Sequence, residues 1–214
     1  MTKFVIFDLD GTLIDAYPAV EETLNYTLSQ CGMPPVDGDV IKRTVGWGDR
    51  HLVRAFVGEE RIGRAIEIYR RHHRESLLRG SSLLPGALDL LMGLKRQGLL
   101  LAVASNRPKE YSVILTRHLG IARLFDRIVC GDEVARPKPA PDILLKIMEE
   151  LGCGPQETCY IGDMTIDVET GQAAGVRTIV IPTGSSTLQE LEEAGAWRVV
   201  ADLSQIPGLL SKIH

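Results

Sequence analysis

The sequence has 214 residues, a formal net charge of −4 at pH 7 and an apolar content of 44%. That length suffices for one large domain or for a core with a small insertion, and the balance of charge signs is typical of a soluble globular protein. The absence of a basic excess argues against a nucleic-acid partner, and no apolar run approaches the roughly 20 residues that cross a bilayer. We therefore expect neither nucleic acid nor membrane among its partners.

None of the four cysteines belongs to a CxxC motif or a pairing framework (Cys31, Cys130, Cys153 and Cys159). Unpaired thiols are the default in an intracellular protein. The charged side chain of Asp8 also interrupts the N-terminal apolar run, which argues against a signal-peptide core. We therefore expect a cytoplasmic protein, and the sequence carries no signal for a particular oligomeric state.

The first predicted element is a short strand at residues 4–7, where four apolar residues indicate burial on both faces of a parallel sheet. Asp8 and Asp10 follow it, and Gly11 with Thr12 then breaks the strand. Carboxylates at the end of a buried strand are costly unless a cation neutralises them, and oxygen ligands suit Mg²⁺. A helix cap or a turn built on Asp side chains is the alternative, and the pair alone does not decide between them.

Residues 15–80 carry no strand pattern. Apolar residues recur at helical spacing over 16–31, 39–44, 49–57 and 59–79, and the breaks between them contain Pro34-Pro35 and Gly46-Trp47-Gly48. We therefore predict an inserted helical domain at residues 15–81. The run of basic residues and histidines at 70–74 is interpreted as a solvated helix face.

Beyond residue 81 helices and strands alternate. Strands are predicted at 99–104, 127–130, 158–161, 178–181 and 198–200, and helices at 87–97, 109–119, 141–151, 166–174, 188–194 and about 205–213. This alternation predicts an α/β fold with a three-layer, Rossmann-like, doubly wound parallel sheet, formed by residues 1–14 and 82–214. Ligands bind such sheets beyond the carboxyl ends of the strands. No GxGxxG or P-loop motif is present, which argues against a dinucleotide or nucleoside-triphosphate site.

Four segments resemble, in order and spacing, the four motifs of the haloacid dehalogenase superfamily. They are Asp8-Leu9-Asp10-Gly11-Thr12, Ser105-Asn106, Lys138 within Arg-Pro-Lys-Pro-Ala-Pro-Asp, and Gly162-Asp163-Met164-Thr165-Ile166-Asp167. The resemblance covers essentially the whole chain, and the helical insertion looks like the inserted cap of that superfamily. Within the superfamily the chain is most similar to the phosphoglycolate phosphatase and β-phosphoglucomutase branch.

The resemblance implies that Asp8 is a nucleophile that forms an aspartyl-phosphate, and that Asp10 is a general acid and base. It also implies Mg²⁺ held by Asp8, by the backbone carbonyl of Asp10 and by Asp163, with Asp167 ligating directly or through a water. Simpler roles stay open: metal binding or capping alone for Asp8, turn stabilisation for Asp10, and a helix N-terminal acid for Asp167.

The second and third motifs imply contacts to the phosphoryl group. Ser105 offers a hydroxyl and nearby backbone N–H groups, with a plain helix cap as the alternative. Asn106 suits either a phosphate contact or loop support. Lys138 lies between two prolines that stiffen its loop, which suits a fixed ammonium group. Gly11 and Thr12, which complete the first motif, are assigned to substrate binding.

Two residues of the insertion are candidates for substrate recognition. Trp47 and Arg50 fall where the resemblance places a specificity loop, and the glycines beside Trp47 permit unusual backbone angles. Arg50 could meet a carboxylate or sugar hydroxyl of a small substrate. The alternative is that Trp47 packs between insertion and core while Asp49 caps the next helix.

These observations together predict a Mg²⁺-dependent hydrolase of small organic phosphate monoesters, most similar to phosphoglycolate phosphatases. Three alternatives remain: a β-phosphoglucomutase-type sugar phosphate mutase, a nucleotidase or pyrophosphatase, and an inactive regulator that binds a phosphate ligand.

Overall fold

A six-stranded parallel sheet forms the centre of the protein. The computed structural model describes residues 2–210. Its strands lie in the order β5-β4-β1-β6-β7-β8, and every neighbouring pair is parallel. Their bounds are Phe4–Phe7 for β1, Leu100–Ser105 for β4, Arg127–Cys130 for β5, Thr158–Gly162 for β6, Arg177–Val180 for β7 and Arg198–Val199 for β8. This sheet confirms the predicted fold class.

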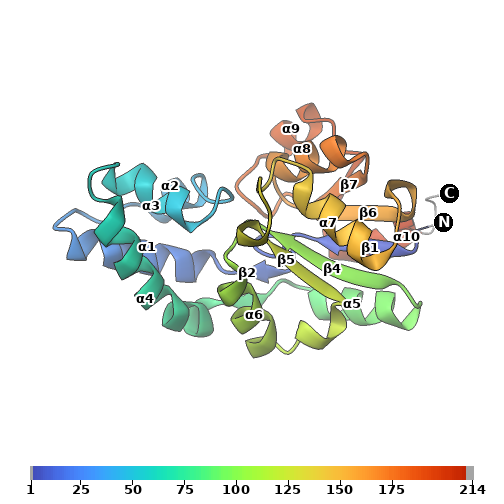
Figure 1. Cartoon of the computed structure of the whole chain (residues 1–214), viewed down its shortest axis with the longest axis horizontal. Coiled ribbons are helices and arrows are strands. Elements are labelled where there is room, and N and C mark those ends of the chain that lie inside the picture. The colour runs from blue at the N-terminus through green and yellow to red at the C-terminus, as the bar shows by residue number, and fades with distance from the viewer. Residues whose placement is uncertain (1, 211–214) are drawn as a thin grey trace.

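The alternation of side chains along β1 builds the cores on both faces of the sheet. Val5 and Phe7 point into one apolar cluster, which α5 (Ala87–Arg96), α6 (Lys109–His118) and α10 (Ile206–Leu210) complete. Phe4 and Ile6 point into the opposite cluster, together with α7 (Asp142–Leu151). Figure 1 shows α5 on one side of the sheet and α7 on the other, with α8 (Thr165–Ala174) and α9 (Leu188–Glu193) on the α7 side. The result is a three-layer α/β arrangement.

Four helices follow the first strand before the chain returns to the sheet. They are α1 (Tyr17–Gln30), α2 (Gly38–Lys42), α3 (Asp49–Val57) and α4 (Ile62–Gly80). These helices share an apolar cluster of their own and lie beyond the end of the sheet, at the left of Figure 1. A two-residue antiparallel ladder between β2 (Ile14–Asp15) and β3 (Ser82–Leu83) joins the points where the chain enters and leaves them. The division at residues 15–81 into a separate domain stays a prediction.

Most predicted elements differ from the observed ones only at their ends. Two strands, β2 and β3, were not predicted because two-residue strands carry no measurable periodicity. Of the helix predicted at about 205–213, the structure has α10 at Ile206–Leu210, and residues 211–213 lie outside the described part. Within residues 2–210, no helix is both long and apolar enough to cross a membrane.

The contact between α8 and β7 leaves no room for a side chain at Gly171. A Cβ at this position would overlap the Thr178 hydroxyl. We expect Gly171→Ala to lower the free energy of unfolding by about 1–3 kcal/mol, as other overpacked cores do, measured by urea denaturation. Gly63→Ala is the control, since nothing lies within 4 Å of a Cβ added at this position in α4 and alanine favours a helix. Equal stability of Gly171→Ala and wild type would contradict this packing.

Candidate active site

Most of the predicted site residues gather at the carboxyl ends of β1, β4 and β6, and Lys138 joins them from the loop between β5 and α7. A cavity with about 690 Å³ of empty space, open in part to solvent, lies between these strand ends and the helical insertion. The core contributes Asp8, Asp10, Ser105, Asn106 and Lys138 to its wall. This is the position at which the strand order of an open parallel sheet reverses and ligands bind.

Asp8 directly follows β1, and the adjoining strand fixes its backbone. Its N–H donates to the Ile161 carbonyl at 2.8 Å. The residue is 7% exposed, and its Oδ1 lies 3.0 Å from Lys138 Nζ. Burial raises the pKa of Asp8 to about 7, an effect that Lys138 opposes and that Asp167 and Asp10 increase. A carboxylate in this position depends on nearby positive charge to stay ionised.

Lys138 is a buried cation rather than a surface lysine. Its Nζ contacts Asp8, lies 2.7 Å from Asp167 Oδ1 and donates to the Tyr160 hydroxyl at 3.1 Å. Burial acts to lower the pKa of Lys138, but Asp167 and Asp8 raise it by more, so the ammonium form is retained. The structure thus places a fixed positive charge against the Asp8 carboxylate.

Asn106 holds the loop that carries Lys138. Its Oδ1 accepts from the Lys138 backbone N–H at 2.9 Å, and its Nδ2 donates to the carbonyls of Lys138 and Gly46, each at 3.0 Å. Of the two roles left open for Asn106, these contacts favour loop support. Ser105 accepts from the Arg107 N–H at 3.2 Å, which is a local turn contact, and its side chain also lines the cavity.

Asp163, which directly follows β6, has one oxygen without a partner. Thr12 Oγ1 donates to Asp163 Oδ1 at 2.6 Å, whereas the buried Oδ2 has no hydrogen-bond partner among the described residues. A Cβ added at Gly11 or at Gly184 would overlap this Oδ2, so two glycines keep space open beside it. Thr12 therefore orients Asp163 and does not line the cavity.

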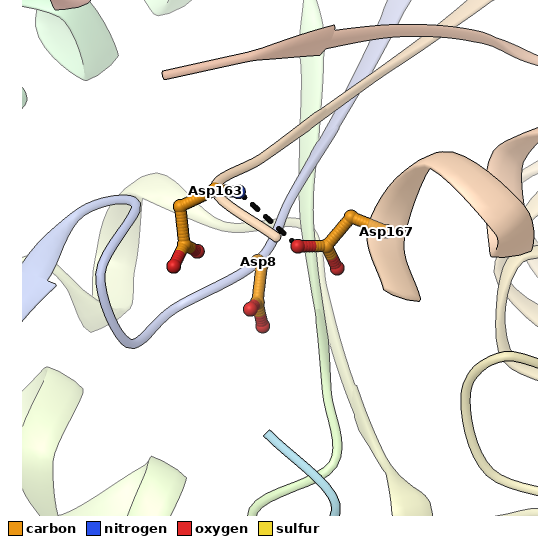
Figure 2. Close-up of side chains that lie close together, drawn as sticks. All are labelled: Asp8, Asp163 and Asp167. Atoms are coloured by element: carbon orange, nitrogen blue, oxygen red, sulfur yellow. Dashed lines mark hydrogen bonds between the residues drawn. The ribbon is translucent and has the colours of Figure 1, made fainter. Parts of the chain in front are cut away.

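Asp167 has both oxygens engaged by protein groups. Its Oδ2 accepts from the backbone N–H groups of Asp163 and Met164 at 3.1 Å each, as Figure 2 shows for Asp163. Its Oδ1 accepts from Lys138 and from the Tyr160 hydroxyl at 2.6 Å. Asp167 is thus an acid in the first turn of α8 that closes the turn after β6.

The three carboxylates of Figure 2 form a candidate cation site. One oxygen each from Asp8, Asp163 and Asp167 lies within 4.8 Å of the others. Burial raises the pKa of Asp163 well above its usual range, and the charges of Asp167 and Asp8 raise it further. The charged form of Asp163 therefore needs a nearby cation. Oxygen ligands, the unpartnered Oδ2 and the space that two glycines leave all suit Mg²⁺.

Two further residues complete the site, and the sequence reasoning missed both. Arg107 binds the Asp10 carboxylate through two hydrogen bonds, Nε to Oδ2 at 2.8 Å and Nη2 to Oδ1 at 2.7 Å. Its Nη1 bonds His73 Nε2 at 2.9 Å. The position of Arg107 directly after the second motif was the available signal. His73 lies in the run at 70–74 for which the charge pattern predicts a solvated face, yet it is 2% exposed.

The structure does not bring Trp47 and Arg50 into the cavity. Both side chains are exposed, and this loop contributes Val45, Gly46 and Gly48 to the cavity wall. A Cβ at Gly46 would overlap the end of the Met164 side chain, so the loop lies directly on the core here. The predicted recognition role of Trp47 and Arg50 has no geometric support in this arrangement.

Comparisons with known proteins give a consistent result. Residues 5–181 match the family described as haloacid dehalogenase-like hydrolase. A phosphoglycolate phosphatase of Rhodospirillum rubrum is 34% identical over 217 residues, which cover 96% of this chain and 90% of that protein. An N-acetylmuramic acid 6-phosphate phosphatase of Pseudomonas aeruginosa is 31% identical over 186 residues, covering 85% and 82%. The structure of a haloacid dehalogenase-like hydrolase from Bacteroides fragilis matches with a TM-score of 0.90 and 27% identity, covering 96% and 100%.

Mg²⁺ should raise the melting temperature if these carboxylates bind it, because a ligand of the native state stabilises that state. We expect a rise that increases with Mg²⁺ concentration in the wild type and is lost in Asp163→Asn, measured by differential scanning calorimetry. Asp89→Asn is the control, since Asp89 is exposed in α5 away from the cavity. A rise of the same size in Asp163→Asn would mean that the ion binds elsewhere.

Proposed function

The chain belongs to the haloacid dehalogenase-like hydrolase family, and on this premise we propose that it is a Mg²⁺-dependent phosphatase of small organic phosphate monoesters, acting through an aspartyl-phosphate on Asp8. The position of Asp8 is the main support for this mechanism. Its buried carboxylate contacts Lys138 at 3.0 Å, lies beside Asp163 and lines the cavity. A nucleophile, a fixed cation and a candidate metal site therefore meet in one place.

Phosphoglycolate is the substrate we propose. The Rhodospirillum rubrum relative is a phosphoglycolate phosphatase and aligns with nearly the whole chain. The cavity also suits a small ester, because Tyr17, Val20 and Leu52 of the insertion close it from the side opposite the strand ends. We propose that the insertion, residues 15–81, acts as a cap that excludes water from the reaction.

In the first step, an oxygen of Asp8 forms a bond to phosphorus while the ester P–O bond breaks. Asp10 donates a proton to the departing alkoxide. In the second step, Asp10 takes a proton from a water that attacks the aspartyl-phosphate, which releases inorganic phosphate and restores Asp8. Lys138 keeps its charge against the phosphoryl oxygens throughout, since its contacts with Asp8 and Asp167 favour the ammonium form.

The metal would be held by Asp8, by Asp163 and by the backbone carbonyl of Asp10. Asp167 supports this arrangement through the backbone N–H of Asp163 and through Lys138. When bound, Mg²⁺ would neutralise negative charge on the phosphoryl group and the carboxylates. Thr12 would orient Asp163 toward the ion by occupying its other oxygen.

Asp8→Asn should abolish turnover of phosphoglycolate, because an amide cannot act as the nucleophile. We expect released phosphate to fall by at least about 10³-fold, as for other lost nucleophiles. Wild type should also label a single aspartate in an acid-quenched reaction with a ³²P-labelled ester. Asp89→Asn serves again as the control. Labelled protein from Asp8→Asn would show that another residue takes the phosphoryl group.

Asp10→Asn should slow hydrolysis by about 10²–10⁴-fold, the usual contribution of general acid–base catalysis. Binding of phosphate mimics such as tungstate should change little, because Asp10 is not proposed to hold the phosphoryl group. Titration calorimetry with tungstate and phosphate release together check this division. Unchanged turnover would remove Asp10 from the mechanism.

Isomerisation of β-glucose-1-phosphate by the wild type without phosphate release would favour the mutase alternative.

A further inference from the structure

Asp10 does not point freely into the cavity. Both oxygens of its carboxylate accept hydrogen bonds from the Arg107 guanidinium, at 2.7 and 2.8 Å. A general acid and base must reach the leaving-group oxygen of the substrate and later a water. Asp10 therefore has to give up this two-point contact before it can act. The Arg107 guanidinium then needs another hydrogen-bond acceptor.

Arg107 is held in place by the helical insertion, independently of Asp10. Arg107 Nη1–H donates to His73 Nε2 at 2.9 Å, so that ring nitrogen carries a lone pair and Nδ1 carries the proton. His73 Nδ1–H then donates to Thr23 Oγ1 at 3.1 Å, and the Thr23 hydroxyl donates to the Ala19 carbonyl at 2.7 Å. Each hydrogen bond in this series, from Arg107 to the Ala19 carbonyl, has one donor and one acceptor. The guanidinium thus keeps a fixed partner when Asp10 leaves.

The ring of His73 is fixed on two further sides. Tyr69 lies with its ring centroid 4.8 Å away, and Tyr111 makes an edge contact at 5.3 Å. Burial is the main cause that lowers the pKa of His73 to about 2, and Arg107 and His72 lower it further. This is consistent with a neutral imidazole that accepts the hydrogen bond from Arg107. A buried guanidinium held this firmly is preorganised to bind a planar two-oxygen anion.

Arg107 and Lys138 are the only cationic side chains that line the cavity among the described residues. Lys138 contacts Asp8, so it belongs to the phosphoryl end. Arg107 lies beside Asp10, the proposed proton donor to the leaving group. Its side chain is 9% exposed, so a charge bound there is largely shielded from water. The second cation therefore lies at the leaving-group end of the site.

We propose that Arg107 binds the carboxylate of the substrate's leaving group, and that Asp10 occupies this position until the substrate displaces it. This role rests on the proposed phosphatase function and adds a carboxylate subsite to it. The exchange replaces one carboxylate by another on the same donors, so the guanidinium keeps its hydrogen bonds. A substrate without a carboxylate would leave those donors without an acceptor once Asp10 moved, which is costly in a buried site. Arg107 thus couples recognition of the leaving group to the release of Asp10.

The test compares 2-phosphoglycolate with 2-hydroxyethyl phosphate, an ester of the same length that has a hydroxymethyl group instead of the carboxylate. Wild type should prefer the acid by about 10- to 100-fold in kcat/KM, the range expected for hydrogen bonds to a charged group. Arg107→Gln should reduce this preference to within about threefold, mainly through a higher KM for 2-phosphoglycolate. Turnover of 2-hydroxyethyl phosphate should fall by a much smaller factor than turnover of 2-phosphoglycolate, because this ester has no carboxylate for Arg107 to bind.

Arg70→Gln is the matched control. Arg70 also binds a carboxylate through two hydrogen bonds, to Asp49 at 2.7 and 3.1 Å, but it is exposed and does not line the cavity. This variant should keep the preference for the acid. Arg107→Lys keeps the charge without the planar fork, so it should fold even if Arg107→Gln does not, and should lose most of the preference.

A purely structural role for Arg107 would lower the turnover of both esters by the same factor, and that result would overturn the proposal. If wild type hydrolyses neither ester, the proposal that phosphoglycolate is the substrate fails, and binding measurements then decide the role of Arg107. Titration calorimetry then measures the affinity of each ester for Asp8→Asn and for Asp8→Asn/Arg107→Gln. At least about tenfold tighter binding of the acid that depends on Arg107 would support the subsite. Equal affinity for the two esters would overturn it.

Discussion

The burial of several carboxylates at one edge of the sheet is the constraint on which the rest of the site depends. Asp8, Asp163 and Asp167 are at most 7% exposed, and each negative charge taken from water must be balanced nearby. Lys138 balances two of them through direct contacts, and backbone N–H groups and hydroxyls satisfy other oxygens. One oxygen of Asp163 stays without a partner among the described residues, and the space beside it suits a cation.

The parallel sheet produces this concentration of charge. β1 lies between β4 and β6, with Phe7 aligned to Val103 on one side and to Ile161 on the other. The chain therefore leaves three adjacent strands at the same edge, and the residues that follow them meet although they are distant in sequence. The apolar faces of β1, packed on both sides, fix the height of Asp8 relative to this edge. The positions of Asp8, Ser105 and Asp163 thus derive from strands, while hydrogen bonds from Asn106 hold the loop that carries Lys138.

The helical insertion also positions residues of the core. Through His73 and Thr23 it positions Arg107, a residue of the core, and through Arg107 it reaches Asp10. Gly46 brings a loop of the insertion onto Met164 and into contact with Asn106, which in turn holds the Lys138 loop. The polar groups on both sides of the cavity are therefore linked by hydrogen bonds that cross from insertion to core. A movement of the insertion would change the surroundings of Asp10 and of Lys138 together.

The sequence by itself determined the fold class, most element positions and the set of polar residues at the strand ends. Apolar periodicity and glycine or proline breaks are local properties, and parallel strands bring Asp8, Ser105 and Asp163, which end or directly follow three of them, to one edge. Only the tertiary structure decided which groups pair within that edge. The contact between Asp10 and Arg107 joins residues 97 positions apart, and His73 is buried within a run of charged neighbours. Tertiary packing sets such pairings, and it likewise set the hydrogen bonds of Asn106 to the Lys138 loop and the position of Trp47 and Arg50 outside the cavity.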